Sequence, residues 1–458
     1  MKRIYGIALA VVTLFSSTLG VTPPLAGITL IGKGQVSGSA LDKSGLTGSI
    51  CQAGNPDNCV PKAIFGGFGS AMTYTGFDNV YIAVPDRGPF DGLTDVPYIN
   101  RFDFLKITTD LNASFPNINV KLLDTRILRD EHGQALVGAA GSFPTPSQHP
   151  SWPPFPILSQ FPLFGLPHNE HSALRFDPEG VRVGPLGIFF VSDEYGPYLF
   201  EFDIFGRLLR RLNVPSKYEI SDPSEDPNAE LLDNTSGRQA NRGMEGLAIS
   251  PNDRFLYGMM QNALIQDNGL SPGTTDRLGL NNRILKIDLL TGRKQEYVYV
   301  LDAINRGQGV SEILAINDHE FLVIERDNRS NLQTPPQAPT RKTIYKIDIS
   351  GATDVSNVDS LPAGELPANI TPVQKTLFID LLDPAFDLAP TIPEKLEGLA
   401  WGPDLPDGRH VLYIISDNDL TPTLDTQIFA FAIDHSLIDF ERQFLPLPVY
   451  PPWLVPRD

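Results

Sequence analysis

A pattern that recurs along the chain limits its possible folds most strongly. The pattern starting at Phe176 begins with a Glu and an apolar strand. It continues with a turn, a second strand, a loop, a third strand that ends in Asp, a turn with Gly and a fourth strand. The same order recurs from Gly243, from Gly309 and from Lys395, and more weakly from Phe65. Helical periodicity is almost absent, and Pro and Gly are frequent. The chain is therefore predicted to be all-β.

Four-stranded units that repeat in this way are typical of a β-propeller, because a closed ring buries the sheet face that each unit alone would expose. We expect a single propeller over residues 27–458, with six blades preferred and five or seven as alternatives. Either the segment Asn112–Leu174 or the strand-like segment Ile28–Ser39 would supply a sixth blade, or complete a blade across the chain ends. Pro- and Gly-rich segments such as Ser142–Pro167 are expected to be long loops between strands.

The N-terminus has the pattern of a secretory signal peptide. Met1-Lys2-Arg3 precede the apolar stretch Ile4–Phe15, and small and polar residues follow. This stretch is too short to span a bilayer, so a membrane anchor is the less favoured alternative. We therefore expect residues 1–26 to be removed and the mature protein to be secreted or periplasmic.

The composition is acidic, with a formal net charge of −18. Such a chain is a poor partner for nucleic acid or for an anionic membrane surface, and a good partner for divalent cations. We expect a monomer that acts on a small molecule.

Cys51 and Cys59 are the two cysteines of the chain, and they flank a polar loop with a Gly and a Pro. In an exported protein this close pair predicts a local disulfide rather than a metal site, which would need more soft ligands.

Acidic residues occupy two equivalent places in the repeats. The first strand of a blade lines the channel of a propeller, so its start and the turn after the second strand lie at the same end of the ring. The first strands carry Glu179, Glu245, Glu312 and Glu397. The turns carry Asp86-Arg87, Asp193-Glu194, Glu325-Arg326-Asp327 and Asp417-Asn418-Asp419. Both sets are expected to meet at one mouth of the channel, with Ser70 and Gln261-Asn262 as gaps in the ring.

Converging carboxylates repel one another unless positive charge lies among them. A bound cation or the arginines Arg87, Arg242 and Arg326 are the candidates. All-oxygen ligands favour Ca²⁺ over Mg²⁺, and the small number of His disfavours zinc and copper. The predicted metal ligands are Glu194, Glu245, Glu312, Glu397 and Asp417. The predicted catalytic residues are Asp86, Arg87, Asp193, Glu325 and Arg326.

A structural role for these acids stays open, because a Glu at a blade start can cap backbone donors and pair with an Arg of the next blade. His168 and His171 in "HNEH" are better explained as solvated loop residues than as ligands. Ser70 lacks the second Gly of a nucleophile elbow, so no Ser–His–Asp site is predicted.

Taken together, the motifs resemble a known family. "PDRGP", "SDEYGPYLFEFD", "NRGMEGLAIS", "FLVIERDNR", "LEGLAWGPD" and "SDND" occur in this order. Over roughly Phe65 to Asp434 the chain resembles the exported phytase-like family, described as "esterase-like activity of phytase". The resemblance implies a β-propeller and, through distant similarity to calcium-dependent propeller phytases, phosphoester hydrolysis.

The sequence therefore favours an exported, Ca²⁺-dependent phosphoester hydrolase in which Arg87 and Arg326 hold phosphate oxygens. Because Lys and Arg are scattered in an acidic chain, a monoester or diester of low charge fits better than a polyphosphorylated substrate. The alternatives are a non-enzymatic propeller that binds a ligand or partner and uses Ca²⁺ structurally, and a carboxylester hydrolase.

Overall fold

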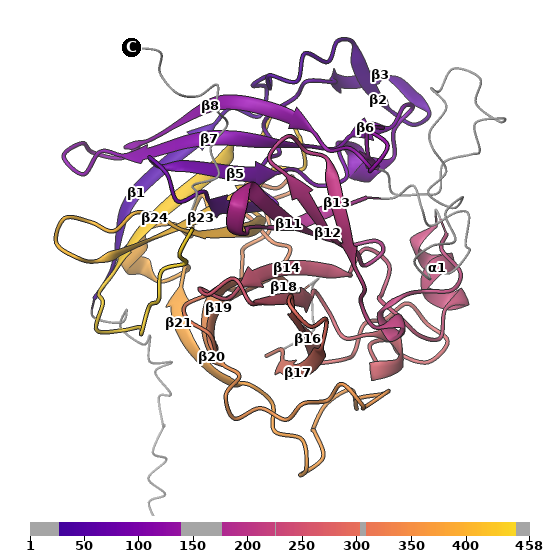
Figure 1. The fold of residues 1–458 in the computed structure, drawn as a ribbon. Helices are drawn as coiled ribbons and strands as arrows, with labels where there is room; N and C mark the ends of the chain where they lie inside the picture. Colours follow the sequence, from indigo (N-terminus) through magenta and orange to yellow (C-terminus); the bar gives the residue numbers. More distant parts are fainter. Residues whose placement is uncertain (1–26, 139–175, 225, 303–307, 446–458) are drawn as a thin grey trace, which may run out of the picture.

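The structure, a computed structural model, describes residues 27–138, 176–224, 226–302 and 308–445. This part of the chain forms five sheets of four antiparallel strands each, which are the blades of a β-propeller (Figure 1). The all-β prediction is confirmed. The expected signal peptide, the expected loop Ser142–Pro167 and the "HNEH" stretch lie outside the described residues.

The strands step outward from the channel in each blade. Blade 1 consists of β4 (Ala71–Tyr74), β5 (Val80–Val84), β7 (Arg101–Thr109) and β8 (Ile118–Ile127). Blade 2 consists of β10 (Pro178–Val183), β11 (Ile188–Asp193), β12 (Leu199–Asp203) and β13 (Leu208–Leu212). Blade 3 consists of β14 (Met244–Ile249), β15 (Phe255–Met260), β16 (Asn281–Asp288) and β17 (Lys294–Val300). Blade 4 consists of β18 (Gly309–Ala315), β19 (Glu320–Arg326), β20 (Lys342–Asp348) and β21 (Gln374–Asp380).

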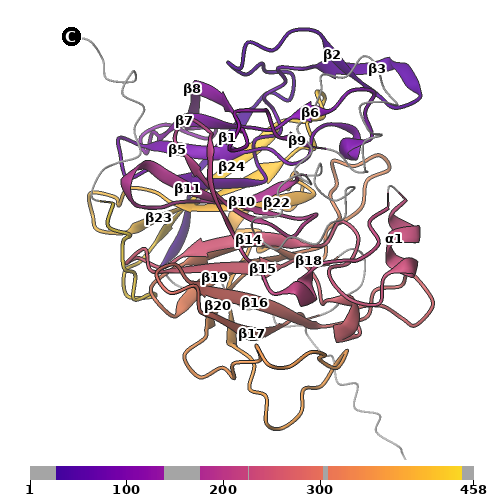
Figure 2. The same ribbon diagram turned by 45° about the vertical axis from the view of Figure 1, so that its right-hand side comes forward.

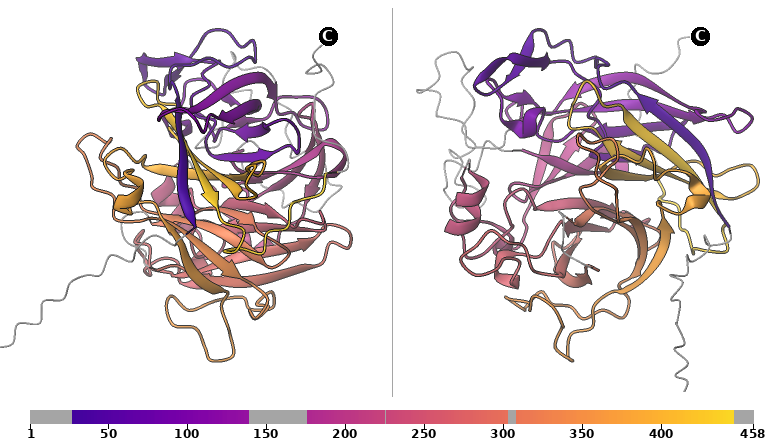
Figure 3. Two further views of the ribbon diagram at one scale, coloured as in Figure 1. Left: turned by 90° about the vertical axis from the view of Figure 1, so that its left-hand side faces the viewer. Right: turned by 180° about the vertical axis from the view of Figure 1, so that it is seen from behind.

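Blade 5 contains strands from both ends of the chain. It consists of β22 (Lys395–Trp401), β23 (His410–Asp417), β24 (Thr426–Ile433) and, as its outermost strand, β1 (Ile28–Val36). The register runs from Ile28 opposite Ile433 to Val36 opposite Thr426, and Figure 3 shows β1 in indigo beside the yellow C-terminal strands. The strand-like N-terminal segment thus completes a blade. Among the described residues five blades are present, which corrects the preferred count of six.

The five inner strands form the ring. β4, β10, β14, β18 and β22 are each neighbours of the next, and β22 lies beside β4, so the ring closes. Figure 2 shows β10, β14, β18 and β22 gathered at the centre of the molecule. Their starts define one mouth of the channel and their ends define the other.

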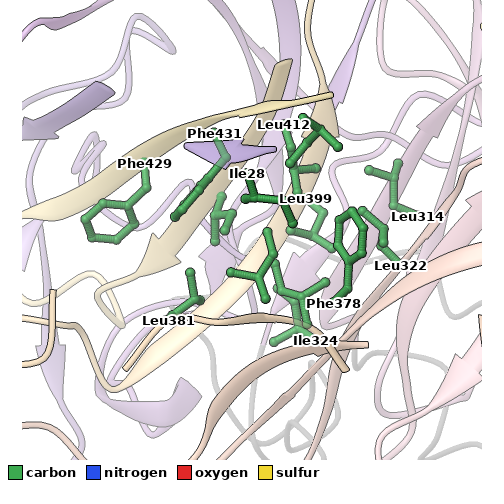
Figure 4. Close-up of a cluster of buried hydrophobic side chains, with 14 of the residues drawn as sticks. Ile28, Leu314, Leu322, Ile324, Phe378, Leu381, Leu399, Leu412, Phe429 and Phe431 are labelled. Carbon is green, nitrogen blue, oxygen red and sulfur yellow. The ribbon is translucent and has the colours of Figure 1, made fainter. Parts of the chain in front are cut away.

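Hydrophobic clusters fill the spaces between neighbouring blades. One such cluster lies at each of the five blade interfaces. At the interface of blades 4 and 5, Leu314 and Ile324 face Leu399 and Phe431, and Ile28 of β1 joins them (Figure 4). These faces bury the apolar side of every sheet, which is what holds the ring shut.

Smaller elements surround the blades. The hairpin of β2 (Ser49–Gln52) and β3 (Asn55–Pro61) projects at the upper right of Figure 1. Cys51 and Cys59 face each other in it and form the predicted disulfide. The other elements are β6 (Tyr98–Ile99), β9 (Val137–Gly138), α1 (Pro227–Asp233), η1 (Phe90–Gly92), η5 (Pro185–Gly187), η6 (Ser216–Tyr218), η7 (Ile265–Asp267) and η9 (Pro384–Phe386). The described residues include no helix with the length and hydrophobicity that crossing a bilayer requires.

Candidate functional site

The inner strands of three blades begin with the same irregularity. In β10, β14 and β22 the pairing with the second strand skips one residue, and the skipped residues are Glu179, Glu245 and Glu397. A bulge of this kind re-aims the side chain of the extra residue. The Gly that follows allows the next blade to approach closely, since a Cβ on Gly246 would lie 2.7 Å from the backbone N of Ile313. The recurring Glu-Gly pair is therefore a local device that places a carboxylate at the channel mouth.

Blade 4 departs from this arrangement by one residue. The residue skipped in β18 is Ser311, so Glu312 occupies the position that Gly holds in the other blades. The Glu312 carboxylate accepts hydrogen bonds from the backbone N of Leu247 at 3.1 Å and of Ile313 at 2.9 Å. It also pairs with Arg182 at 2.8 Å. Glu312 was predicted as a metal ligand of the ring, and the structure instead places it in a contact between inner strands.

Arg87 lies between two acids of blade 2. It follows β5, and its Nη1 lies 2.9 Å from Asp177 Oδ2 and 3.7 Å from Glu194 Oε2. Its backbone N also donates to Asp177 Oδ1, and its Nη2 pairs with Asp91. In the described part of the chain, Arg87 Nε is buried and makes no hydrogen bond. Asp86, the preceding residue, accepts from the backbone N of Gly88.

Asp193 and Glu194, adjacent in sequence, have different roles. Asp193 accepts hydrogen bonds from the backbone N of Asp177 at 2.6 Å and of Gly196, so it holds the turn together. Burial raises the pKa of Asp193 to about 7, and these two backbone donors oppose the shift. Glu194 points to Arg87 and to the other acids. The structure thus gives Asp193 a positioning role.

Glu325 lies apart from these acids. Its carboxylate accepts from Tyr299 at 2.8 Å and Gln308 at 2.6 Å, and it pairs with Lys375 at 2.6 Å. These partners belong to blades 3 and 4 and to the connection between them. Because side chains alternate along a strand, Glu325 points away from the side on which its neighbour Arg326 lies. The prediction that Glu325 joins the ring of acids was wrong.

Arg326 does reach the mouth. It forms an ion pair with Glu397 of blade 5, and its Nε donates to Ser311 at 2.9 Å. Its third nitrogen, Nη1, donates to Asn328 at 2.7 Å. Each nitrogen of Arg326 thus donates to a side chain of blade 4 or 5, which is the structural pairing considered from the sequence.

Two charged residues of the site were not predicted as part of it. Asp177 directly precedes β10, and Lys395 opens β22. Asp419, which was expected at the mouth, follows β23. Lys395 pairs with Asp419 and lies 4.0 Å from Asp417. A usable signal existed for Lys395 and Asp177, since each stands two residues before a Glu of the recurring motif.

We call the converging groups the acidic cluster. Its carboxylates are Asp86, Asp177, Glu179, Glu194, Glu245, Glu397, Asp417 and Asp419, and they outnumber its cationic groups, Arg87, Arg242, Arg277, Arg326 and Lys395. All carboxylates but Asp419 are at most 5% exposed. The cluster contains two triads whose ligand atoms lie within 4.8 Å of one another, Asp86 with Asp417 and Asp419, and Asp177 with Glu179 and Glu194.

The charge of the cluster is not balanced. Burial raises the pKa of Glu179, Glu245 and Asp417 well above its usual range, and neighbouring acids raise it further. Burial raises the pKa of Asp86 and of Asp177 to about 7, although Arg87 opposes the shift. In the described part of the chain, Glu245 Oε2 and Asp417 Oδ2 are buried without a hydrogen-bond partner. Oxygen atoms in this state fit a cation ligand, so the buried acidic cluster can hold a metal ion.

Nucleophilic chemistry based on Ser and His finds no support here. Ser70 is fully buried. The His residues that the structure describes are His132, His319, His410 and His435, and none belongs to the acidic cluster.

Comparison with known families agrees with this architecture. The model of the phytase-like family, described as esterase-like activity of phytase, matches residues 63–420. The chain belongs to the phytase-like family. The matched range includes every member of the acidic cluster.

Relatives of this phytase-like chain add little about its chemistry. An uncharacterized secreted protein of Arthroderma benhamiae is 29% identical over 348 residues, which are 66% of this chain and 63% of that protein. The chain therefore matches less than two thirds of the length of this curated relative.

Solved structures show distant likeness. A calcium-binding protein, regucalcin, from Agrobacterium tumefaciens matches with 10% identity and a TM-score of 0.33, over 82% of this chain and 92% of that one. Virginiamycin B lyase from Staphylococcus aureus matches with 10% identity and a TM-score of 0.29, over 89% of this chain and 100% of that one. Likeness at this level carries no argument about function.

Proposed function

We propose that this phytase-like chain is an exported hydrolase of phosphate esters that depends on a divalent cation, and that the cation is Ca²⁺. The observation that carries the proposal is the meeting of buried carboxylates from four blades at one channel mouth. Buried charge of one sign is costly unless it is paired, and the cationic side chains present do not match the number of acids. A cation bound among the carboxylates would supply the missing charge.

The donor atoms support the choice of Ca²⁺. Each of the two triads offers three carboxylate oxygens, and no His or Cys belongs to either of them. Ligands made of oxygen alone suit hard cations, and Ca²⁺ accepts a variable number of ligands more readily than Mg²⁺ does. Glu194, Glu245 and Asp417 remain the proposed ligands from the sequence analysis, and Glu179 and Asp177 join them.

Arg87 is the proposed partner of the substrate. A bound Ca²⁺ would neutralise phosphate charge and make an adjacent water a better nucleophile. Arg87 is held by Asp177 through Nη1, and its Nη2 pairs with Asp91, whose side chain is 73% exposed, so a phosphate oxygen can compete for Nη2. Arg326 suits this task less well, because all three of its nitrogens already donate to neighbouring side chains.

The charge of the site also limits the substrate. Acids outnumber cations in the cluster, so each phosphate group beyond the first would meet carboxylates rather than arginines. A small monoester or diester therefore suits this site better than a polyphosphate.

The proposal is tested with three chromogenic esters, p-nitrophenyl phosphate, bis-p-nitrophenyl phosphate and p-nitrophenyl acetate, with Ca²⁺ and with EGTA. We expect turnover of one or both phosphates that EGTA abolishes and Ca²⁺ restores. The variant Glu245→Gln should lose at least tenfold in kcat/KM at limiting Ca²⁺. Its matched control is Glu201→Gln, whose Glu pairs with Arg210 on the protein surface. Turnover of the acetate alone would refute the proposal.

A second candidate function is a non-enzymatic propeller in which Ca²⁺ only holds the blades together. The ion pair of Arg326 with Glu397 and that of Arg87 with Asp177 favour it, because each joins two neighbouring blades. This candidate predicts no turnover of any ester but a melting temperature that falls in EGTA.

A further inference from the structure

A cavity lies at the mouth of the channel opposite the acidic cluster. Its volume is about 450 Å³, which is in the range of sites for small molecules. All five inner strands contribute near their ends, through Thr73, Arg182, Ile249, Leu314 and Trp401. The C-terminal segment Phe440–Leu445 lines the cavity as well. Nothing in the proposed function uses this space.

Arg182 stands between the two mouths. Its Nη1 donates to the carbonyl oxygens of Met72 and Val181, and its Nη2 donates to that of Ile313. Nη2 also pairs with Glu312 at 2.8 Å. The side chain thus links three inner strands across the channel, and it separates the cavity from the acidic cluster.

The cavity offers a hydrogen-bond donor. The hydroxyl oxygen of Thr73 accepts from the backbone N of Val183 at 3.4 Å, which leaves its proton to be donated. Arg182 also lines the cavity, but both of its Nη atoms donate to protein oxygens and its Nε is enclosed by the protein. A ligand that brings an acceptor to the Thr73 hydroxyl group is therefore favoured.

The remaining walls are apolar. Ile249 and Leu314 line the cavity, and Trp401 packs against Phe440 with ring centroids 4.7 Å apart. The indole N–H of Trp401 already donates to the carbonyl oxygen of Ala315, so the ring presents apolar surface. A ligand with a flat apolar body therefore suits these walls.

The charges around the cavity indicate which kind of ligand group fits there. The charge of Arg182 is matched by Glu312, and that of Arg442 at the rim is matched by Asp404 at 2.6 Å. Glu441, the other acid of the rim, is exposed and solvated. A carboxylate would bring a second negative charge close to Glu312, and a cation would bring donors toward Arg182. A carbonyl oxygen avoids both conflicts.

We propose that this cavity binds a small uncharged molecule that has an apolar ring and a carbonyl oxygen, with the carbonyl accepting a hydrogen bond from the Thr73 hydroxyl group. The site is independent of the metal centre, so its ligand binds whether or not Ca²⁺ is present.

The test uses three probes of nearly equal shape that differ in charge, namely benzamide, benzoate and benzamidine. Binding to the whole protein in EGTA is measured by ligand-observed NMR and calorimetry. We expect benzamide to bind about tenfold more tightly than either charged probe, which is the effect of roughly one hydrogen bond or one unfavourable charge. Tighter binding of benzoate or benzamidine, or no binding of benzamide at millimolar concentration, would overturn the proposal.

Variants locate the site. Ala315→Phe should fill the cavity and abolish benzamide binding, and its matched control Ala315→Ser should leave the binding unchanged. Thr73→Val removes a hydroxyl at similar volume and should weaken binding less than Ala315→Phe does. Melting curves check that each variant folds. Unaltered benzamide binding by a folded Ala315→Phe variant would contradict the assignment. Glu245→Gln should bind benzamide as the wild type does, so failure of the metal proposal leaves this result intact.

Discussion

Glu245 and Glu325 are buried acids of neighbouring blades, yet their surroundings differ. Glu325 has an ammonium group, a phenol, an amide and a backbone N–H around its two oxygens. Glu245 has a hydrogen bond from Gln261 on one oxygen and, among the described residues, none on the other, and further carboxylates surround it. The comparison teaches that burial alone does not mark a site. What marks the channel mouth is negative charge that the protein leaves unmatched.

The largest expected effect concerns the matched acid. Glu325→Ala would leave three neutral donors without their acceptor and Lys375 with Asp302 as its remaining carboxylate, so we expect the free energy of unfolding to fall by about 3 kcal/mol. Denaturant unfolding of the variant measures this change. A loss below about 1 kcal/mol would mean that Glu325 is not the structural acid described here.

Calcium should act on the unmatched acids with an effect nearly as large. At a Ca²⁺ concentration 100 times the Kd, the free energy of unfolding should rise by about 2.7 kcal/mol, and EGTA should reverse the gain. Calorimetric scans measure it, with Mg²⁺ as the comparison ion. Equal melting temperatures in Ca²⁺ and EGTA would show that the mouth holds no ion.

The pH dependence of stability in the metal-free protein should further distinguish the acidic cluster from the surroundings of Glu325. Asp86 and Asp177 have a pKa of about 7 in the folded protein, against an ordinary value of 3.8. The folded state therefore binds more protons than the unfolded state between these values, and stability falls as the pH rises from about 4 to about 7. We expect a loss of roughly 2 kcal/mol in EGTA, which is less than independent shifts would give because the groups interact. Ca²⁺ should abolish the trend, and a rise of stability with pH in EGTA would contradict it.

The smallest expected effect is a gain in stability, whereas Glu325→Ala is expected to cause a loss. In EGTA, Glu245→Gln removes one of several repelling charges, so stability should rise by about 1 kcal/mol. The same variant should bind Ca²⁺ at least tenfold more weakly, as titration calorimetry can show. A loss of stability in EGTA would make Glu245 an acid of the same kind as Glu325.

The sequence predicted most of the fold. The copies that begin at Phe65, Phe176, Gly243, Gly309 and Lys395 are the five blades, because turn residues and alternating strands repeat visibly. The preferred sixth blade was wrong, because one outer strand comes from the opposite end of the chain. Pairing of β1 with β24 depends on contacts over the whole chain length, which no local pattern reveals.

The site was predicted in part, and the errors have a physical origin. Glu179, Glu245 and Glu397 meet as expected, since the Glu-Gly pair encodes a bulge. In "GVSEI" the residue at the bulge is Ser311, so alignment on Glu312 was displaced by one residue. A shift of one residue changes the face on which a strand side chain lies. Asp177 and Lys395 were overlooked because the prediction considered only the Glu of the recurring motif, and each of them stands two residues before that Glu.

The pairing of the first strand with the last also fixes when the molecule can be completed. β1 has no partner until β24 exists, so blade 5 lacks its outermost strand until all the other blades have been made. Completion of this propeller is therefore a late event, during which the first strand stays without its partner while four blades already have all of their strands.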